Sequence, residues 1–434
     1  MLRIRILIAL SVVILIFLPM SLLGADAESN LWVTVGEDAF NTLRSSRAIG
    51  GPADLARLDA RDGVVITRMA ESDLPRFAET IHREHKRCGG FMVHASREAA
   101  LEALRVHAQP SLRQPLGAPP SYVIDQPVWV RRLEDSLDEA KILANIRILS
   151  EDFVNRFYSD AAGENAAVWI RDLWRGYAEW RPEVTVELVE HTDWRQPSVM
   201  LTIPGTTRSE EIVVLGGHLD SVVWAGNQNP GFSAPGADDN ASGIATLSEV
   251  IRVAMEEGFA PQRTVKFIGY AAEEVGLRGS QEIAGDHAAA GAQVVAVLQL
   301  DMTAYHGSPQ DIALLSDFTD STLTAFVGDL IDTYLTDLTR TSTACGYGCS
   351  DHAAWTAEGY PAAMPAESRL PDLNPNLHRT TDTLASLGDS AAHAFKFARL
   401  ASAFTVELGR DAESAIFEDG FESGNTVAWS TAVP

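Results

Sequence analysis

The sequence predicts an α/β fold with a mostly parallel central sheet and helices on both faces, preceded by a small α+β unit. Two observations lead to this prediction. Short apolar runs rich in β-branched residues, each ended by polar residues, are typical of buried parallel strands. Stretches with apolar residues at helical spacing lie between them. Alternating strands and helices indicate a parallel sheet, which binds its ligands at the carboxyl ends of the strands.

Three of the apolar runs are followed directly by side chains that can bind a metal ion. Because the carboxyl ends of parallel strands meet at one edge of a sheet, we expect these side chains to lie close together. The runs and the residues after them are Ile212–Leu215 with His218, Thr264–Tyr270 with Glu273 and Glu274, and Val294–Leu300 with Asp301.

The stretch Pro235–Gly243, read PGADDNASG, places the carboxylates Asp238 and Asp239 between glycines and directly before a helix. Apolar residues recur at helical spacing from Ile244 onward, and the pattern stops at Gly258. Asp239 stands where the helix begins, so it is also a candidate helix cap. We expect it, like Asp220, to support the site from outside the ligand set. His378, in NLHRTTDT, supplies a further ligand type.

Imidazole and carboxylate ligands without a thiolate suit zinc. Counting the adjacent aspartates as one, the six candidate groups are too many for one tetrahedral site, but they suit two ions about 3.5–4 Å apart that share a carboxylate and activate a water. A Glu-Glu pair then lets one carboxylate bind metal while its neighbour takes a proton. Any one of these residues alone could be a cap, a packing group or a solvated charge. Their recurrence in order, with flanking glycines, favours the metal site.

Five ordered motifs resemble the co-catalytic di-zinc aminopeptidases, a family that includes a secreted bacterial leucyl aminopeptidase. The motifs are GGHLDS, PGADDNASG, AEEVGLRGS, LQLDMT and CGYGCSDHAAW, and the resemblance covers roughly residues 142–408. It implies two Zn²⁺ ions and peptide substrates with a free N-terminus. The resemblance implies that Asp238 bridges the two ions, that His218 and Asp301 bind one ion, and that Glu274 and His378 bind the other. It implies that Glu273 is the general base and that Asp220 orients His218. It also implies a cis peptide between Asp238 and Asp239.

The resemblance also gives roles to the loop around Tyr347, whose hydroxyl would help to stabilise the oxyanion. A buried structural tyrosine is the alternative. Cys345 and Cys349 could bind metal, but the export signal described below favours a disulfide. His352 is expected to be structural.

The substrate pocket that the resemblance implies is apolar. Ala366 and Leu370 replace aromatic residues of the leucyl aminopeptidase, so we expect a roomier pocket that admits Phe or Met as well as Leu. Its expected lining is Met302, Met364, Ala366, Leu370 and Leu377.

The chain divides into four predicted parts. Residues 1–27 read as a signal peptide, with arginines at the start, an apolar core and a small-x-small cleavage site; an uncleaved membrane anchor is the alternative. Residues 28–127 read as a propeptide and proline-rich linker, 128–408 as the catalytic domain and 409–434 as a tail for processing, surface sorting or disorder. We therefore expect a secreted bacterial protein, extracellular or periplasmic, with no membrane attachment after signal cleavage.

The unit before the linker resembles the family's propeptides, which assist folding and restrain activity. A permanent accessory domain is the alternative. His82 and His85 lie three residues apart in this unit, and we interpret them as surface residues.

The chain has 434 residues, 46% of them hydrophobic, and a net charge of −25. The negative charge argues against a nucleic-acid partner. Three function classes remain. The first is an aminopeptidase that removes N-terminal, preferably hydrophobic, residues. The second is another di-zinc hydrolase of the same fold, such as a carboxypeptidase or dipeptidase, or a glutaminyl cyclase, and the third is a binding module with an inactive peptidase fold. The match in the disulfide loop favours the first class, and the complete ligand set disfavours the third.

Overall fold

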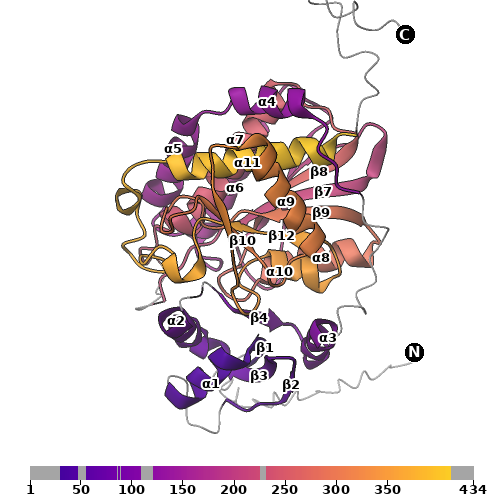
Figure 1. Ribbon diagram of the computed structural model, residues 1–434. Coiled ribbons are helices and arrows are strands. Elements are labelled where there is room, and N and C mark those ends of the chain that lie inside the picture. The colour runs from indigo at the N-terminus through magenta and orange to yellow at the C-terminus, as the bar shows by residue number, and fades with distance from the viewer. Residues whose placement is uncertain are drawn as a thin grey trace, which may run out of the picture.

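The centre of the larger domain is a six-stranded mixed sheet (Figure 1). The computed structural model describes residues 30–46, 55–85, 87, 89–108, 121–224 and 231–411. The expected signal peptide, most of the proline-rich linker and the tail beyond Asp411 lie outside these residues. The strands of the central sheet are β5 (Thr185–Val189), β6 (Ser198–Ile203), β7 (Arg208–His218), β8 (Arg263–Tyr270), β9 (Gln293–Gln299) and β12 (Ala362–Ala363).

The strand order is β12-β9-β7-β8-β6-β5. The first four strands are parallel, whereas β6 and β5 are antiparallel to their neighbours. The predicted fold class is therefore confirmed, with an antiparallel extension at one edge. A parallel partner needs a crossover, but β5 and β6 are joined by a short loop that returns the chain directly.

Helices cover both faces of this sheet, because alternate residues of its strands point to opposite sides. On β7, Val213 and Leu215 face the core under α5, α6, α7 and α11, while Val214 faces the core under α8 and α10. The helices are α4 (Pro127–Asp135), α5 (Glu139–Arg147), α6 (Ala161–Tyr177), α7 (Gly243–Glu256), α8 (Arg278–Ala289), α9 (Ser321–Tyr334), α10 (His352–Ala357) and α11 (Ala392–Gly409). Among the described residues, no helix combines the length and apolarity needed to cross a membrane.

A second sheet, in the order β11-β10-β13, supports the loops near the strand ends. Its strands are β10 (Ile312–Leu315), β11 (Arg340–Thr343) and β13 (Pro365–Ala366). The disulfide loop begins two residues after β11, and the expected pocket residue Ala366 lies in β13 itself. This sheet therefore holds two substrate-side segments next to each other.

The N-terminal unit is an α+β layer, drawn in indigo at the lower side of Figure 1. Its antiparallel sheet has the order β2-β3-β1-β4. The elements are β1 (Asn30–Gly36), α1 (Glu37–Ser46), β2 (Asp59–Arg61), β3 (Val64–Ala70), α2 (Leu74–His85), β4 (Phe91–His94) and α3 (Arg97–Ala108).

This unit shares a hydrophobic core with the larger domain. Phe77 and Val93 of the unit belong to the same buried cluster as Val222, Trp224 and Ala272, which lie in loops at the strand ends. The unit is thus packed against the loops that follow β7 and β8. Separating it would expose apolar side chains on both partners.

The predicted boundary at residue 127 lies a few residues too late. The Tyr122 hydroxyl donates to the carbonyl of Val295, and the main-chain amides of Asp125 and Gln126 donate to the Glu407 carboxylate of α11. The segment from residue 121 therefore packs on the larger domain. Proline content alone suggested a linker, because these tertiary contacts leave no local signal.

Candidate metal centre

Three neighbouring parallel strands bring most of the candidate ligands to one edge of the central sheet. His218 ends β7, Glu273 and Glu274 follow β8, and Asp301 follows β9. Since β7 lies between β8 and β9, these side chains meet as the sequence predicts. All four are buried.

Two groups of potential ligands lie side by side here and share one aspartate. His218, Asp239 and Asp301 form the first group, and Asp239, Glu274 and His378 form the second; within each group the ligand atoms lie within 4.8 Å of one another. His218 Nε2 is 2.9 Å from Asp239 Oδ1 and 3.2 Å from Asp301 Oδ1. His378 Nε2 is 3.1 Å from Asp239 Oδ2 and 3.0 Å from Glu274 Oε2.

The prediction that Asp238 bridges the two groups is wrong. Its carboxylate accepts hydrogen bonds from the Ala304 amide (3.0 Å) and from Asn374 Nδ2 (2.9 Å), away from both histidines. Asp239 takes the bridging position, one oxygen toward each imidazole, and the cis peptide follows Asp239, not Asp238. Two adjacent aspartates look alike in sequence, and only the path of the backbone distinguishes them.

Asp239 was also expected to support the site from outside the ligand set or to cap the helix. It does neither, because α7 begins at Gly243, beyond an irregular turn from Ala237 to Ser242. The amides of Asp238 and Asp239 donate to the two carboxylate oxygens of Asp382, both at 3.1 Å. Asp382 thus fixes the backbone on which the bridging carboxylate is carried.

Asp220 has two roles in this geometry. Its main-chain carbonyl oxygen lies 3.1 Å from His218 Nδ1, and one oxygen of its carboxylate lies 3.5 Å away. Both are acceptors, so Nδ1 of a neutral ring carries the proton and Nε2 is left to face the ligand group. The same carboxylate accepts the amides of Glu273 and Glu274, at 3.0 and 3.1 Å, and so orients the Glu-Glu pair.

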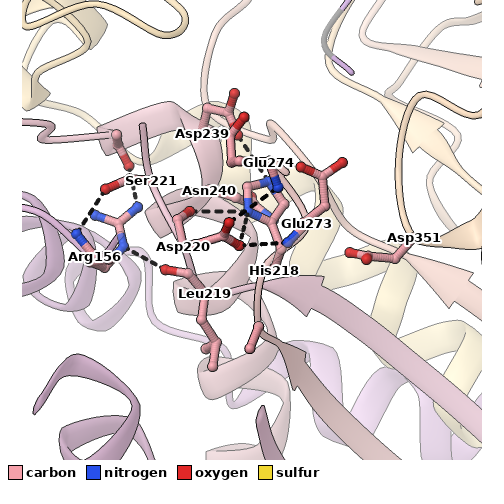
Figure 2. Close-up of polar contacts among 12 residues, drawn as sticks. Arg156, His218, Leu219, Asp220, Ser221, Asp239, Asn240, Glu273, Glu274 and Asp351 are labelled. Atoms are coloured by element: carbon pink, nitrogen blue, oxygen red, sulfur yellow. Dashed lines mark hydrogen bonds and ion pairs between the residues drawn. The ribbon is translucent and has the colours of Figure 1, made fainter. Parts of the chain in front are cut away.

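Glu273 differs from its neighbour in its surroundings. Among the described residues neither of its carboxylate oxygens has a hydrogen-bond partner, although the side chain is buried, and Figure 2 draws no dashed line to this carboxylate. Burial raises the pKa of Glu273 well above its usual value; the charge of His218 opposes this rise, while Glu274 and Asp351 add to it. A buried carboxylate free of competing bonds can accept a proton.

The bridging aspartate has the opposite electrostatic environment. Burial alone would raise the pKa of Asp239, but the hydrogen bonds to His218 and His378 hold it well below the usual range. Burial raises the pKa of Glu274 to about 7. Of these two carboxylates, Asp239 is therefore the one that its surroundings keep ionised.

The donor atoms fit zinc. Nitrogen and oxygen ligands about 2.0 Å from a tetrahedral ion are ~3.3 Å apart, and the spacings of 2.9 to 3.2 Å in both groups are near this value. The second Glu274 oxygen, Oε1, is buried without a hydrogen-bond partner among the described residues. Each group would hold one ion through one histidine and two carboxylates, with Asp239 shared.

The N-terminal unit reaches the metal centre, which corrects one prediction. His82 of α2 is not simply a surface residue, because its ring lies 5.0 Å from that of His378, centroid to centroid. Burial lowers the pKa of His82 to about 3. His85 remains partly exposed and lies 2.9 Å from the Thr42 hydroxyl.

Tyr347 is also contacted by the N-terminal unit. Its hydroxyl donates to Thr34 Oγ1 of β1 at 2.6 Å, and the same Thr34 atom lies 2.7 Å from His94 Nε2. The structure joins Cys345 to Cys349, so the expected disulfide is present beside Tyr347. His352 belongs to neither ligand group.

The expected pocket residues form two buried clusters. Met302 packs with Leu377, and Leu373 lies against them. The second cluster contains Met364, Ala366 and the disulfide cysteines, with Leu370 packed on its edge. The apolar character expected of both segments is present.

Sequence reasoning missed several residues that hold the ligands in place. Asp382 stands four residues after His378 in the same motif, and that spacing was the available signal. The Ser350 hydroxyl donates to Asp301 Oδ2 at 2.6 Å, and Asn240 Nδ2 donates to the carbonyl of Leu300, next to Asp301. Arg156, whose guanidinium donates to the carbonyls of Leu219 and Gly236, gave no signal, since it lies far upstream of every motif.

Comparison with known proteins gives three kinds of match. Residues 198–403 match a family model described as Peptidase family M28. A probable leucine aminopeptidase of the fungus Arthroderma otae is 38% identical over 283 residues, which are 64% of this chain and 76% of that protein. The LapA aminopeptidase of Legionella pneumophila aligns with a TM-score of 0.73 and 25% identity over 89% of this chain and 100% of its own. A zinc aminopeptidase from Bacillus subtilis shares the fold, with a TM-score of 0.52 and 14% identity over 64% of this chain and 97% of its own.

The match to LapA extends beyond the predicted catalytic domain. Residues 128–408 are about two thirds of the chain, so an alignment over 89% must include part of the N-terminal unit. Because the relatives come from fungi as well as bacteria, the comparisons do not support the expectation of a bacterial origin.

Proposed function

Since the chain belongs to peptidase family M28 and is a zinc aminopeptidase, we propose that it is a secreted enzyme that removes hydrophobic N-terminal residues from peptides with two zinc ions. The observation that carries the two-ion proposal is the position of Asp239 between His218 and His378, with one carboxylate oxygen toward each. A single-ion site would not need a carboxylate shared in this way.

The proposed ligands are His218 and Asp301 for one ion, Glu274 and His378 for the other, and Asp239 for both. When bound, the two ions would polarise the scissile carbonyl and activate a water. Glu273 would accept a proton from the attacking water and deliver it to the leaving amine. Its carboxylate is suited to this role because no described residue occupies it with a hydrogen bond.

Asp220 and Tyr347 support this chemistry in different ways. Asp220 holds the amides of Glu273 and Glu274 and keeps His218 Nε2 directed at the ligand group. Tyr347 would donate its hydroxyl to the oxyanion that forms on the substrate carbonyl. In the structure this hydroxyl donates to Thr34, so the proposed role requires that contact to break.

The enzymatic test uses leucine anilides with a free or an acetylated amine. We expect turnover of the free amine only, loss of activity on chelation and recovery on addition of zinc. Within the free series, we expect kcat/KM for Leu, Phe and Met anilides to agree within about tenfold, a spread typical of one methylene in an apolar pocket.

Cleavage of the acetylated anilide, or indifference to the chelator, would favour another hydrolase of this fold. A hundredfold preference for Leu over both Phe and Met would contradict the roomier pocket while leaving the aminopeptidase activity intact.

We further propose that the N-terminal unit restrains activity in the intact chain. His82 covers the His378 side of the metal centre, and Thr34 binds the hydroxyl that the reaction would need. We expect His82→Ala in the full chain to raise kcat/KM roughly tenfold, because the substitution removes the ring that lies against His378. A tenfold change corresponds to a loss of ~1.4 kcal/mol in the binding of the N-terminal unit to the metal centre.

The matched control is Glu84→Ala, on the exposed side of the same helix, which should leave kcat/KM unchanged. A fall in activity with His82→Ala would instead indicate a permanent accessory domain that helps to bind substrate.

A further inference from the structure

Arg156 is a buried arginine whose hydrogen bonds go to main-chain carbonyls around the metal centre. Only 1% of its surface is exposed. It lies in the irregular stretch between α5 and α6, outside every motif of the site. Nε donates to the Leu219 carbonyl at 2.9 Å and Nη2 to the Gly236 carbonyl at 2.9 Å. Nη1 donates to the carbonyls of Pro235 and Leu149, at 2.6 and 3.0 Å.

Two of these acceptor segments carry metal ligands. Leu219 directly follows His218, and the pair Pro235-Gly236 comes three residues before Asp239 (Figure 2). Ser221 joins the same two segments, because its hydroxyl accepts the Arg156 amide at 3.0 Å and donates to the Ala234 carbonyl at 2.8 Å. Arg156 therefore connects the loop after β7 to the turn before α7.

The turn before α7 lies too close to Arg156 and Ser221 for any side chain at position 236. Gly236 has φ of +51°, and a Cβ atom built there would lie 2.9 Å from Arg156 Nη2 and 2.7 Å from Ser221 Cβ. Glycine at this position lets the turn come within hydrogen-bond distance of the guanidinium.

The charge of Arg156 also fits this place. Burial lowers its pKa to about 10, and the carboxylates of Asp382, Asp239, Asp220 and Glu274 oppose that fall. The group therefore stays cationic at neutral pH among the carboxylates of the site. A guanidinium combines this charge with several donors in a rigid plane, which a lysine ammonium does not.

We propose that Arg156 is a positioning residue of the metal centre: its guanidinium binds the backbone of the loops that carry His218 and Asp239 and thereby sets the distance between these two ligands. The inference rests on the proposed zinc site. It assigns a function in metal binding to a residue that touches neither metal nor substrate.

The test measures zinc affinity by competition with a chromophoric chelator in the full chain. Outer-shell partners typically change metal affinity by about 10- to 100-fold, and we expect a loss of this size in Arg156→Met and in Arg156→Lys. Wild-type affinity in Arg156→Lys would overturn the proposal, because a point charge would then be sufficient.

Arg181→Met is the matched control. Arg181 is also buried and donates to the main-chain carbonyl of Phe259 at 2.9 Å and to Glu183 at 2.7 Å. Phe259 lies beyond the far end of α7 from Asp239, and a helix of 14 residues spans ~21 Å. We expect Arg181→Met to lower the melting temperature without changing zinc affinity. If Arg156→Met likewise lowered the melting temperature without changing zinc affinity, the role of Arg156 would be structural.

If Arg156→Met fails to fold, a rescue experiment distinguishes a positioning role of Arg156 from a role in folding. In Arg156→Ala, millimolar guanidinium chloride should restore zinc affinity severalfold, whereas equal sodium chloride should not. No difference between the two salts would contradict the proposal. Failure of the wild-type chain to bind zinc would instead refute the proposed metal site itself.

Discussion

Replacing Glu273 with glutamine is expected to lower kcat by about 10²- to 10⁴-fold, the usual contribution of a general base. Glutamine has nearly the same shape but cannot accept the proton. Both zinc ions should remain bound, because Glu273 belongs to neither ligand group. Metal content by atomic spectroscopy and kcat on leucine anilide are the two measurements.

The control for this variant is Glu274→Gln, its sequence neighbour. Glu274 Oε2 lies 3.0 Å from His378 Nε2, so this substitution should weaken the zinc ion that these two residues share. If Glu273→Gln lost zinc and Glu274→Gln kept it, the two roles would be exchanged.

Replacing Asp239 with asparagine is expected to weaken both zinc ions and to lower activity by at least about a thousandfold. Among the described residues, its carboxylate is the one group that belongs to both ligand groups, and an ion clamp contributes several kcal/mol to transition-state stabilisation. Zinc titration of the apo protein should show reduced stoichiometry or affinity at both sites.

Asp238→Asn is the matched variant on the adjacent residue. Asparagine can still accept the Ala304 amide, so we expect two zinc ions at saturation and an affinity loss within the 10- to 100-fold range of outer-shell changes. Equal stoichiometric loss in the two variants would mean that Asp238 also binds metal.

Local sequence determined the strands, the helix after the paired aspartates and the residue types of the metal centre. The runs at Ile212–Leu215, Thr264–Tyr270 and Val294–Leu300 are apolar on both faces because helices cover both sides of the sheet. Their carboxyl ends had to meet once the strands were parallel neighbours. Side-chain chemistry then indicated zinc without knowledge of any distance.

Tertiary structure decided which neighbours act together. Asp238 and Asp239 have the same side chain, and the turn that directs one at the histidines and the other at Asn374 is set by contacts with Asp382. Arg156 and His82 reach the centre from segments with no metal-binding pattern of their own. Such contacts depend on how distant parts of the chain pack, and a local pattern carries no information about packing between residues so far apart.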